Sequence, residues 1–396
     1  MPTVVLVGTL DTKGDEHGYL RDRLLEHGVD VLLVDVGTRA PRIRPDVAAA
    51  EVAGRDPAEL TDRGEAVETM ARGAERVVRR LYDEGRLQAV GALGGSGGTS
   101  IAAGAMRALP VGVPKLIVST MASGDTRPYV GTTDITMTYS VVDVAGINSV
   151  SARILDNAAA ALAGMARVEP APAGARPLVA ATMFGVTTPC VTRARERLEE
   201  RGYEVLVFHA TGTGGQSMET LVRDGVLAGV LDVTTTEIAD DLVGGVLSAG
   251  PHRLEAAGAA GVPQVVSLGA LDMVNFGPLE TVPERFRDRN LYVHNQTVTL
   301  MRTTPGECRE LGRRIGRKLA HAAGPTALYV PLHGVSALAV DGGAFHDPEA
   351  DEALLAGLRE TLPDDAEVHE LDLEINDPRF ADAMVDRLDE LIREER

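Results

Sequence analysis

Short runs of apolar, largely β-branched residues alternate along the chain with longer segments in which apolar positions recur at helical spacing. Runs such as 3–9, 29–36 and 88–93 contain few polar residues, which is typical of parallel strands buried on both faces. Segments such as 15–27 and 62–84 have the period of an amphipathic helix. This alternation predicts an α/β fold made of open, mostly parallel sheets with helices on both faces.

The same pattern predicts further elements in both halves of the chain. Strands are expected at 115–120, 135–139, 177–185, 204–208, 228–233, 264–268, 291–293, 327–331 and 368–373, and helices at 99–109, 141–168, 191–201 and 378–395. The stretch 39–60 contains Pro and Asp without a period and is expected to be an irregular excursion. Pro and Gly in 169–176 would end a helix, so this segment is the predicted linker between two Rossmann-like domains, 1–170 and 176–396.

Glycine-rich and polar clusters directly follow several of the predicted strands. The strongest is Gly94-Gly95-Ser96-Gly97-Gly98-Thr99. Glycines let the backbone turn its amides toward an anion, and the N-terminus of the next helix adds partial positive charge. The Lys-Ser/Thr ending of a P-loop is absent. Because ligands of doubly wound sheets bind outside the carboxyl ends of the strands, we expect this motif to hold nucleotide phosphates.

Two further clusters follow the first and fourth predicted strands. In Gly8-Thr9-Leu10-Asp11-Thr12-Lys13-Gly14, the lysine could neutralise phosphate and the aspartate could bind Mg²⁺ or a ribose hydroxyl. The segment 119–125 is small and polar, which suits close approach of a ligand. The residues expected to hold the nucleotide are Gly8, Thr9, Asp11, Thr12, Lys13, Gly94, Gly95, Ser96, Gly97, Gly98, Thr99, Ser119 and Thr120, and the candidate Mg²⁺ ligands are Asp11 and Asp125.

The second half carries candidate catalytic residues at the ends of its predicted strands. They are His209, which precedes the glycine-rich run 211–215, together with His294, His333 and Asp272. Histidine is a general base or metal ligand near neutral pH, and three strand-end histidines of one sheet could meet. The alternative is that each is a hydrogen-bonded loop residue. Since no two share a short ligand spacing, metal binding has little support. The run 211–215 is a second possible anion site.

Composition narrows the class of protein. The formal charge of −19 and the aromatic content of 3% disfavour nucleic-acid binding. No apolar run approaches the roughly 20 residues of a membrane span, and the N-terminus has no basic leader. The two cysteines, Cys190 and Cys308, are far apart in the sequence and indicate no disulfide framework. These observations predict a cytoplasmic protein.

Four motifs in order resemble the Tm-one-like ATP-binding domain family, which has many bacterial and archaeal members and includes part of a tomato inhibitor of tobamovirus replication. They are the motifs at 8–14, 94–99 and 209–215 and the segment Leu268-Gly269-Ala270-Leu271-Asp272-Met273-Val274-Asn275-Phe276-Gly277. The resemblance covers the whole chain. It implies two Rossmann-like domains, ATP bound by the first, and dimerisation, but no established reaction.

The leading hypothesis is an ATP- and Mg²⁺-binding protein that acts as a small-molecule kinase or ligase on an anionic metabolite in the interdomain cleft. One rival is a nucleotide-responsive binding module without turnover. Another is a metal-dependent hydrolase or lyase that uses the second-domain histidines. Whether the protein is an enzyme is therefore left open at this point.

Overall fold

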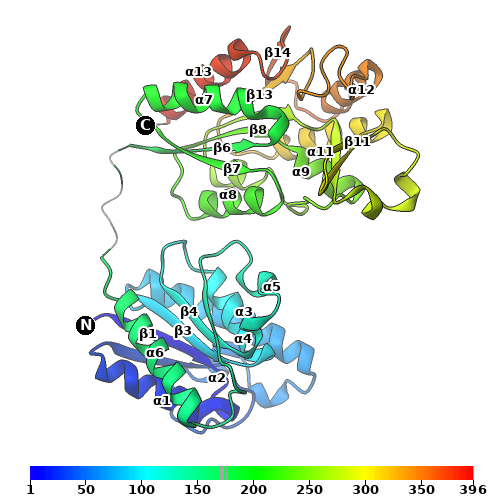
Figure 1. The fold of residues 1–396 in the computed structure, drawn as a ribbon. Helices are drawn as coiled ribbons and strands as arrows, with labels where there is room; N and C mark the ends of the chain where they lie inside the picture. Colours follow the sequence, from blue (N-terminus) through cyan, green and yellow to red (C-terminus); the bar gives the residue numbers. More distant parts are fainter. Residues whose placement is uncertain (170–173, 175, 396) are drawn as a thin grey trace. The chain divides into compact units, whose positions relative to one another are not determined.

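The chain forms two units, which contacts divide into Met1–Ala173 and Gly174–Arg396, and each is described by itself. The computed structural model describes residues 1–169, 174 and 176–395. Each unit is a parallel sheet with helices on both faces, as the alternation of apolar runs predicted (Figure 1). Most of the predicted linker 169–176 lies outside the described residues.

The first unit contains a five-stranded parallel sheet with the order β2-β1-β3-β4-β5. Val5 in β1 lies opposite Leu32 of β2 on one side and Val90 of β3 on the other. Chain order therefore reverses between β1 and β3. The strands are β1 (Thr3–Gly8), β2 (Asp30–Asp35), β3 (Ala89–Gly94), β4 (Lys115–Ser119) and β5 (Thr136–Tyr139).

Two apolar cores cover the two faces of this sheet, because side chains alternate along each strand. Val5 and Val7 point to the core formed with α3 and α4, whereas Val4 and Leu6 point to the core formed with α1 and α6. The helices are α1 (Leu10–Glu26), α2 (Ala49–Ala53), α3 (Arg63–Asp83), α4 (Ser96–Arg107), α5 (Arg127–Val130) and α6 (Ser149–Met165).

The second unit contains a six-stranded parallel sheet with the order β14-β13-β9-β8-β6-β7. Its first five strands follow the same relative order as those of the first unit, with the reversal between β6 and β8. The strands are β6 (Leu178–Met183), β7 (Glu204–His209), β8 (Gly229–Thr234), β9 (Gln264–Gly269), β13 (Thr326–Pro331) and β14 (Glu367–Leu371).

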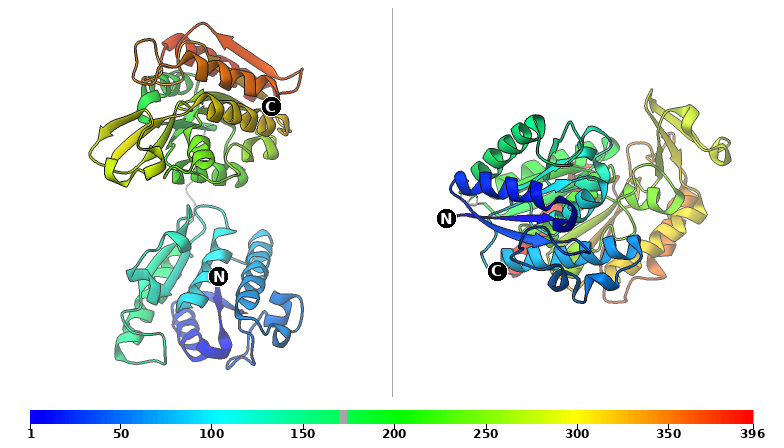
Figure 2. Two further views of the ribbon diagram at one scale, coloured as in Figure 1. Left: turned by 90° about the vertical axis from the view of Figure 1, so that its right-hand side faces the viewer. Right: turned by 90° about the horizontal axis from the view of Figure 1, so that it is seen from below.

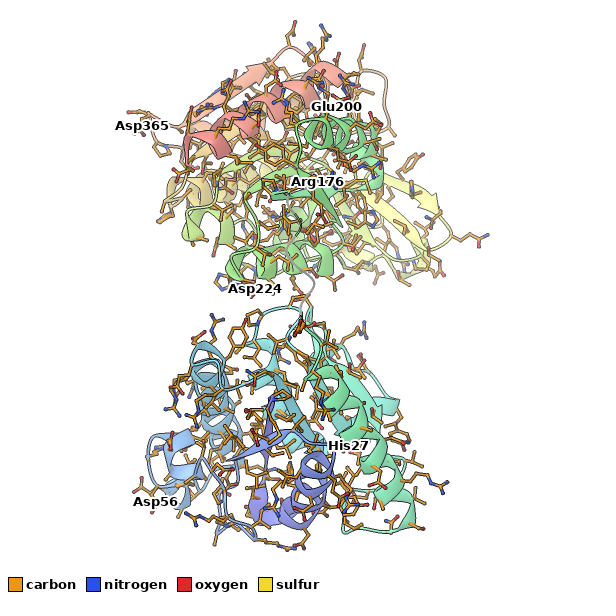
Figure 3. The ribbon with its side chains drawn as sticks, turned by 90° about the vertical axis from the view of Figure 1, so that its left-hand side faces the viewer. His27, Asp56, Arg176, Glu200, Asp224 and Asp365 are labelled. Atoms are coloured by element: carbon orange, nitrogen blue, oxygen red, sulfur yellow. The ribbon has the colours of Figure 1, made fainter. Side chains whose placement is uncertain are left out.

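A three-stranded antiparallel sheet, β10-β12-β11, is inserted between β9 and β13 and projects from the second unit (yellow in Figure 2). It consists of β10 (Met273–Phe276), β11 (Leu291–Asn295) and β12 (Val298–Arg302). The helices of the unit are α7 (Thr188–Glu200), α8 (Thr213–Arg223), α9 (Thr236–Val243), α10 (Ala256–Ala260), α11 (Pro305–Ala320), α12 (Pro348–Arg359) and α13 (Pro378–Glu394). Charged side chains such as Glu200 and Asp365 extend from its surface (Figure 3).

Four predicted helices begin several residues away from their predicted starts, among them α7, which starts at Thr188 instead of 191. α4 starts at Ser96, so the glycine motif forms its first turn rather than a loop ahead of it. α1 starts at Leu10 and is interrupted by a non-helical residue at Lys13. The helix predicted at 141–168 starts only at Ser149, because the Asn148 side chain accepts the amides of Val150 and Ser151 in a capping box.

Candidate functional site

The first unit contains a cavity of about 900 Å³ beside the carboxyl ends of β1 and β3. These strands are neighbours, but α1 follows β1 onto one face of the sheet while α4 follows β3 onto the other. Doubly wound sheets open a ligand-binding crevice where strand order reverses in this way. The motifs at 8–14 and 94–99 therefore contribute to one cavity, which we call the switch-point cleft.

The cleft has a polar part and an apolar part. The polar and glycine residues that line it are Thr9, Asp11, Thr12, Lys13, Gly37, Thr38, Arg39, Thr61, Arg63, Gly94, Gly95, Ser96, Gly97 and Gly98. The apolar residues are Val36, Pro57, Ala58, Leu60, Ala66, Val67, Met70 and Ile101. Its volume is in the range of small-molecule sites, which are largely apolar with a few convergent polar groups.

The N-terminus of α4 opens into this cleft. Gly95 is the N-cap residue and has no side chain to cap the first-turn amides, which also have no acceptor within the helix. A Cβ added at Gly97 would meet no protein atom within 4 Å. Backbone amides and the positive end of the helix dipole are therefore directed at open space, which suits an anion such as phosphate.

Lys13 also lines the cleft, and its ammonium group donates a hydrogen bond to the carbonyl oxygen of Val144, in the loop before α6. The non-helical backbone at Lys13, with φ −124° and ψ 27°, interrupts α1 at this point. Thr12 donates its hydroxyl to that of Thr9 at 3.0 Å, so both hydroxyls stay at the cleft. The positive charge of Lys13 thus lies near the cleft, but its ammonium group is already hydrogen-bonded to the loop that contains Val144.

A pair of carboxylates lies beside the cleft, and sequence analysis identified only one of them. One oxygen of Asp35 accepts the amides of Leu10 at 3.1 Å and Gly37 at 2.9 Å. Burial raises the pKa of Asp35, and the negative charge of Asp11 adds to the rise. A Cβ at Gly37 would lie 2.6 Å from Asp11 Oδ1 and 3.0 Å from Asp35 Oδ1. Only glycine at position 37 therefore lets the backbone come so close to both carboxylates. The sequence Asp-Val-Gly at the end of β2 is the signal from which Asp35 could have been predicted.

Asp11 has one oxygen that the protein leaves unused. Its Oδ2 accepts the amide of Thr38 at 3.3 Å, whereas Oδ1 is buried and has no hydrogen-bond partner in the described part of the chain. A buried carboxylate oxygen normally has a partner. The missing partner at the edge of the cleft is consistent with a cation or a hydroxyl group bound there.

The cleft lining does not include four of the residues that sequence analysis placed at the nucleotide, Gly8 and three polar residues. A Cβ added at Gly8 would lie 2.0 Å from His17 Nε2, so this glycine makes room for the His17 ring. Thr99 and Ser119 are buried and share a hydrogen bond of 2.7 Å, which ties α4 to the end of β4. Thr120 lies near Gly95, 3.8 Å from the position of an added Cβ. Thr99 and Ser119 therefore act as structural supports for the glycine turn.

Asp125 does not line the switch-point cleft, whereas Asp11 does. It lies on the surface, where its carboxylate binds the guanidinium of Arg127 at 2.8 and 2.9 Å, and this hydrogen bonding lowers the pKa of Asp125 to about 2. Within the described residues, no group of three or more His, Cys, Asp or Glu side chains could hold a metal ion.

The expectation that His209, His294 and His333 meet at one sheet edge is wrong. His209 ends β7 and His333 follows β13, and these strands are four places apart in the sheet, about 19 Å at the usual strand spacing. His294 lies in β11, which belongs to the antiparallel sheet. His209 stacks on Phe184, and His333 binds Asp372 at 2.5 Å on the surface.

The second predicted anion site is already filled by the protein. The amides of Gly212 and Gly215 donate to Glu237 Oε1 at 2.7 and 3.0 Å. The other oxygen of Glu237 accepts from Arg253 at 2.7 Å, and Arg253 also binds Asp232. All three charged side chains are buried. The glycine-rich run 211–215 thus serves internal structure and is closed to an external anion.

The fourth candidate catalytic residue, Asp272, is buried inside the second unit. It accepts a hydrogen bond of 2.7 Å from Ser336, and burial raises its pKa to about 6. With an exposed fraction of 1%, Asp272 has no access to a substrate in this conformation.

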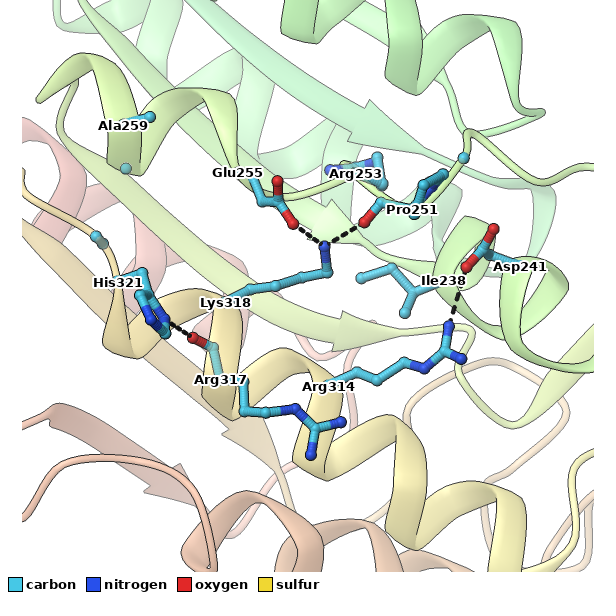
Figure 4. A pocket seen from close by; sticks show the side chains of 13 residues that line it. Ile238, Asp241, Pro251, Arg253, Glu255, Ala259, Arg314, Arg317, Lys318 and His321 are labelled. Carbon is cyan, nitrogen blue, oxygen red and sulfur yellow. Dashed lines mark hydrogen bonds and ion pairs between the residues drawn. The ribbon is translucent and has the colours of Figure 1, made fainter.

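A second cavity, of about 670 Å³, lies in the second unit between α9, α10 and α11 (Figure 4). Its basic side chains have acceptors of their own. Arg314 binds Asp241 at 2.9 Å, and Lys318 binds both Glu255 and the carbonyl of Pro251. Because its charges are already compensated, this cavity is a weaker candidate for anion binding than the switch-point cleft.

No helix in the described part of the chain combines the length and apolar character required to span a membrane.

A structure comparison aligns 67% of the chain with 83% of a UDP-GlcNAc 2-epimerase from Methanocaldococcus jannaschii, at 11% identity and a TM-score of 0.25. These values are too low to carry an argument about function.

Relatives are found over the whole chain. A "UPF0261 protein" from Clostridium tetani is 54% identical over 97% of this chain and 98% of its own length. The tomato "ToMV resistance protein Tm-1(GCR237)" is 43% identical over 97% of this chain but only 55% of its own length. The N-terminal domain of the uncharacterised protein family UPF0261 matches residues 2–171, and the C-terminal domain matches 176–392. The chain therefore belongs to the uncharacterised protein family UPF0261, with the Tm-1 proteins among its relatives.

Proposed function

We propose that the first unit binds ATP in the switch-point cleft. The observation that carries the proposal is the uncapped N-terminus of α4, which opens into a cavity with an adjoining apolar wall. The triphosphate would accept hydrogen bonds from the amides of the glycine turn, close to the charge of Lys13. The apolar side chains of Leu60, Val67 and Met70 would pack against the adenine ring.

Mg²⁺ would enter with the nucleotide. The unused Oδ1 of Asp11, the hydroxyls of Thr9 and Thr12 and the phosphate oxygens are the hard oxygen ligands that Mg²⁺ prefers. When bound, the ion would neutralise phosphate charge. Asp35 is held by two amides of the protein and would keep these bonds rather than contact the ion.

The reaction class that this arrangement suits is phosphoryl or nucleotidyl transfer to a small anionic acceptor, as in a kinase or ligase. Such chemistry depends mainly on positioning and electrostatic stabilisation, which a glycine turn, a lysine and an aspartate can provide. The second-unit histidines have no part in this proposal, because they lie apart from one another and one of them is in a different sheet.

One observation favours a second candidate, a nucleotide-responsive binding module without turnover. The ammonium of Lys13 cannot keep its bond to Val144 unchanged while it turns to a phosphate. Nucleotide binding would then change the conformation of the loop before α6. Such a conformational change would transmit a signal without any chemical reaction. Formation of ADP or AMP with a panel of small acids distinguishes the candidates, because the module gives no product.

Cellular context is part of the proposal. Both cysteines are free and buried, and burial raises the pKa of Cys308 to about 11. Inert, unpaired thiols fit a reducing cytoplasm. We also propose that the chain forms the dimer that its resemblance implies, which light scattering of the purified protein tests.

Calorimetric titration with Mg-ATP tests the proposed site, with Gly97→Val as the decisive variant. The new side chain meets no protein atom at its Cβ but enters the space of the phosphates, so the dissociation constant should rise at least about tenfold. Gly306→Val is a matched control, because Gly306 is also the second residue of a helix with open space around it. Absence of heat with the wild type, or equal affinity of Gly97→Val, would contradict the proposal.

A further inference from the structure

Two arginines of the switch-point cleft have no role in the proposed nucleotide site. Arg39 follows β2, and Arg63 is the first residue of α3. Both line the cleft and are exposed. Neither guanidinium has a hydrogen bond, an ion pair or an aromatic partner among the described residues, whereas neighbours such as Arg55 and Arg80 bind Glu65 and Glu51.

Their positions are electrostatically unfavourable in the protein alone. A cation at the first residue of a helix opposes the helix dipole, and Arg63 has that place in α3. The cleft lining contains three cations, Lys13, Arg39 and Arg63, but one carboxylate, Asp11, in a chain with 58 acidic and 39 basic residues. A bound anion would remove both unfavourable interactions.

The arginines lie on chain segments other than those that form the phosphate site. The phosphate site uses the ends of β1 and β3, while Arg39 continues the segment with Gly37 and Thr38, and Arg63 continues the segment with Leu60 and Thr61. A cavity of about 900 Å³ is near the upper limit for small-molecule sites, so it offers room for a second small ligand.

We propose that Arg39 and Arg63 form a second anion subsite, which binds the carboxylate or phosphate group of a small acid beside the nucleotide. The planar guanidinium donates two parallel hydrogen bonds to such an oxyanion, which favours these groups over other anions. The proposal rests on the proposed function in one respect, that the nucleotide occupies the rest of the cleft. It places the acceptor of that function in the first unit.

The test is calorimetric titration of inorganic phosphate, and separately of malonate, into the full chain saturated with Mg-AMP-PNP at low ionic strength. One anion should bind per chain. The double substitution Arg39→Ala and Arg63→Ala should weaken that binding at least about tenfold and change the affinity for AMP-PNP less than about threefold. Binding of phosphate alone indicates a phosphate ester as the natural ligand, and binding of malonate indicates a carboxylic acid. Arg44→Ala is the matched control, an exposed arginine that does not line the cleft.

Two results would overturn the subsite. One is absence of anion binding to the saturated protein. The other is a loss of AMP-PNP affinity in the double variant as large as that in Gly97→Val, since the arginines would then bind the nucleotide itself. If AMP-PNP fails to bind the wild type, the proposed function fails. The same anions are then titrated into Gly97→Val with and without the double substitution. If an anion binds and the double substitution abolishes this binding, the subsite is retained, and if no anion binds, the subsite is also overturned.

Discussion

Asp240 and Asn275 show how strongly burial changes the chemistry of single residues in this chain. Asp240 accepts the backbone amide and the side-chain amide of Asn275, each at 2.7 Å, and is fully buried. Desolvation raises the pKa of Asp240 from 3.8 to about 7, against the lowering effect of these hydrogen bonds. The sequence analysis did not single out Asp240, because its residue type and position in the sequence do not reveal that this acid is buried.

The raised pKa predicts that the second unit loses stability as pH rises. Between the unfolded pKa of 3.8 and the folded pKa of about 7, the folded state holds a proton that the unfolded state has released. The free energy of unfolding should therefore fall with rising pH in this window, by up to about 1.4 kcal/mol per pH unit from Asp240. Hydrogen exchange of second-unit peptides, followed by mass spectrometry across this pH range, measures the fall in the free energy of unfolding.

Asp240→Asn should flatten this pH dependence and keep the fold. The Oδ1 of Asn275 is buried without a partner among the described residues, so a flipped Asn275 could accept from the new amide. The exposed Asp365→Asn removes one acid without touching the pair and should leave the slope unchanged. An unchanged slope in Asp240→Asn would mean that another acid, such as Asp272 with its pKa of about 6, dominates.

At the scale of elements, the two glycine-rich turns differ in what occupies them. The turn of α4 opens into a cavity, whereas the amides of Gly212 and Gly215 at the start of α8 bind Glu237. Both motifs follow a strand and precede a helix, so the sequence predicted the same chemistry for both. The carboxylate that fills the second turn comes from α9, more than 20 positions later, and no local pattern connects it to Gly212.

Glu237→Gln should destabilise the second unit and leave ATP binding in the first unit unchanged. The substitution removes one of the buried negative charges that surround Arg253, and breaking such a pair costs about 3 kcal/mol. Urea unfolding followed by circular dichroism measures the loss. Glu200→Gln on the surface of α7 is the control, and it should change stability by less than about 0.5 kcal/mol. Wild-type stability in Glu237→Gln would show that the amides of Gly212 and Gly215 need no anion.

The strands of the two parallel sheets were predicted well, because the central ones are apolar runs buried on both faces. The sequence analysis did not predict β10 and β12 of the antiparallel sheet. Helix starts and side-chain encounters were predicted less well, for two reasons. The glycines of 94–98 weaken helical periodicity although the chain is already helical from Ser96. The meeting of His209 with His333 depends on strand order, which places β6, β8 and β9 between β7 and β13 and cannot be read from spacing along the chain.

At the scale of the whole molecule, the two units share one strand topology, but their glycine-rich turns have different surroundings. Strand order is the same in both units up to the fifth strand, yet the glycine-rich turn of the first unit lines a cavity, whereas that of the second unit binds Glu237. Each unit also has apolar cores of its own, and none of the described core clusters draws residues from both units.

Residues 1–169 should therefore fold alone and bind Mg-ATP with the affinity of the full chain. All lining residues of the switch-point cleft lie between Thr9 and Ile101, and both faces of the first sheet are covered by its own helices. Circular dichroism and calorimetry of the fragment measure folding and binding. A folded fragment that binds more than about tenfold more weakly would show that the second unit completes the site.

The scarcity of lysine has a practical consequence for labelling. The chain has three lysines, and the side chain of Lys115 is inaccessible, paired with Asp134 at 2.8 Å. Amine-reactive reagents are thus confined to the N-terminus, Lys13 and the largely buried Lys318, whose side chain is 14% exposed. Of these three amines, Lys13 lines the switch-point cleft, so the fraction of a fluorophore or isotopic tag that is attached to Lys13 reports on that cleft without any engineered cysteine.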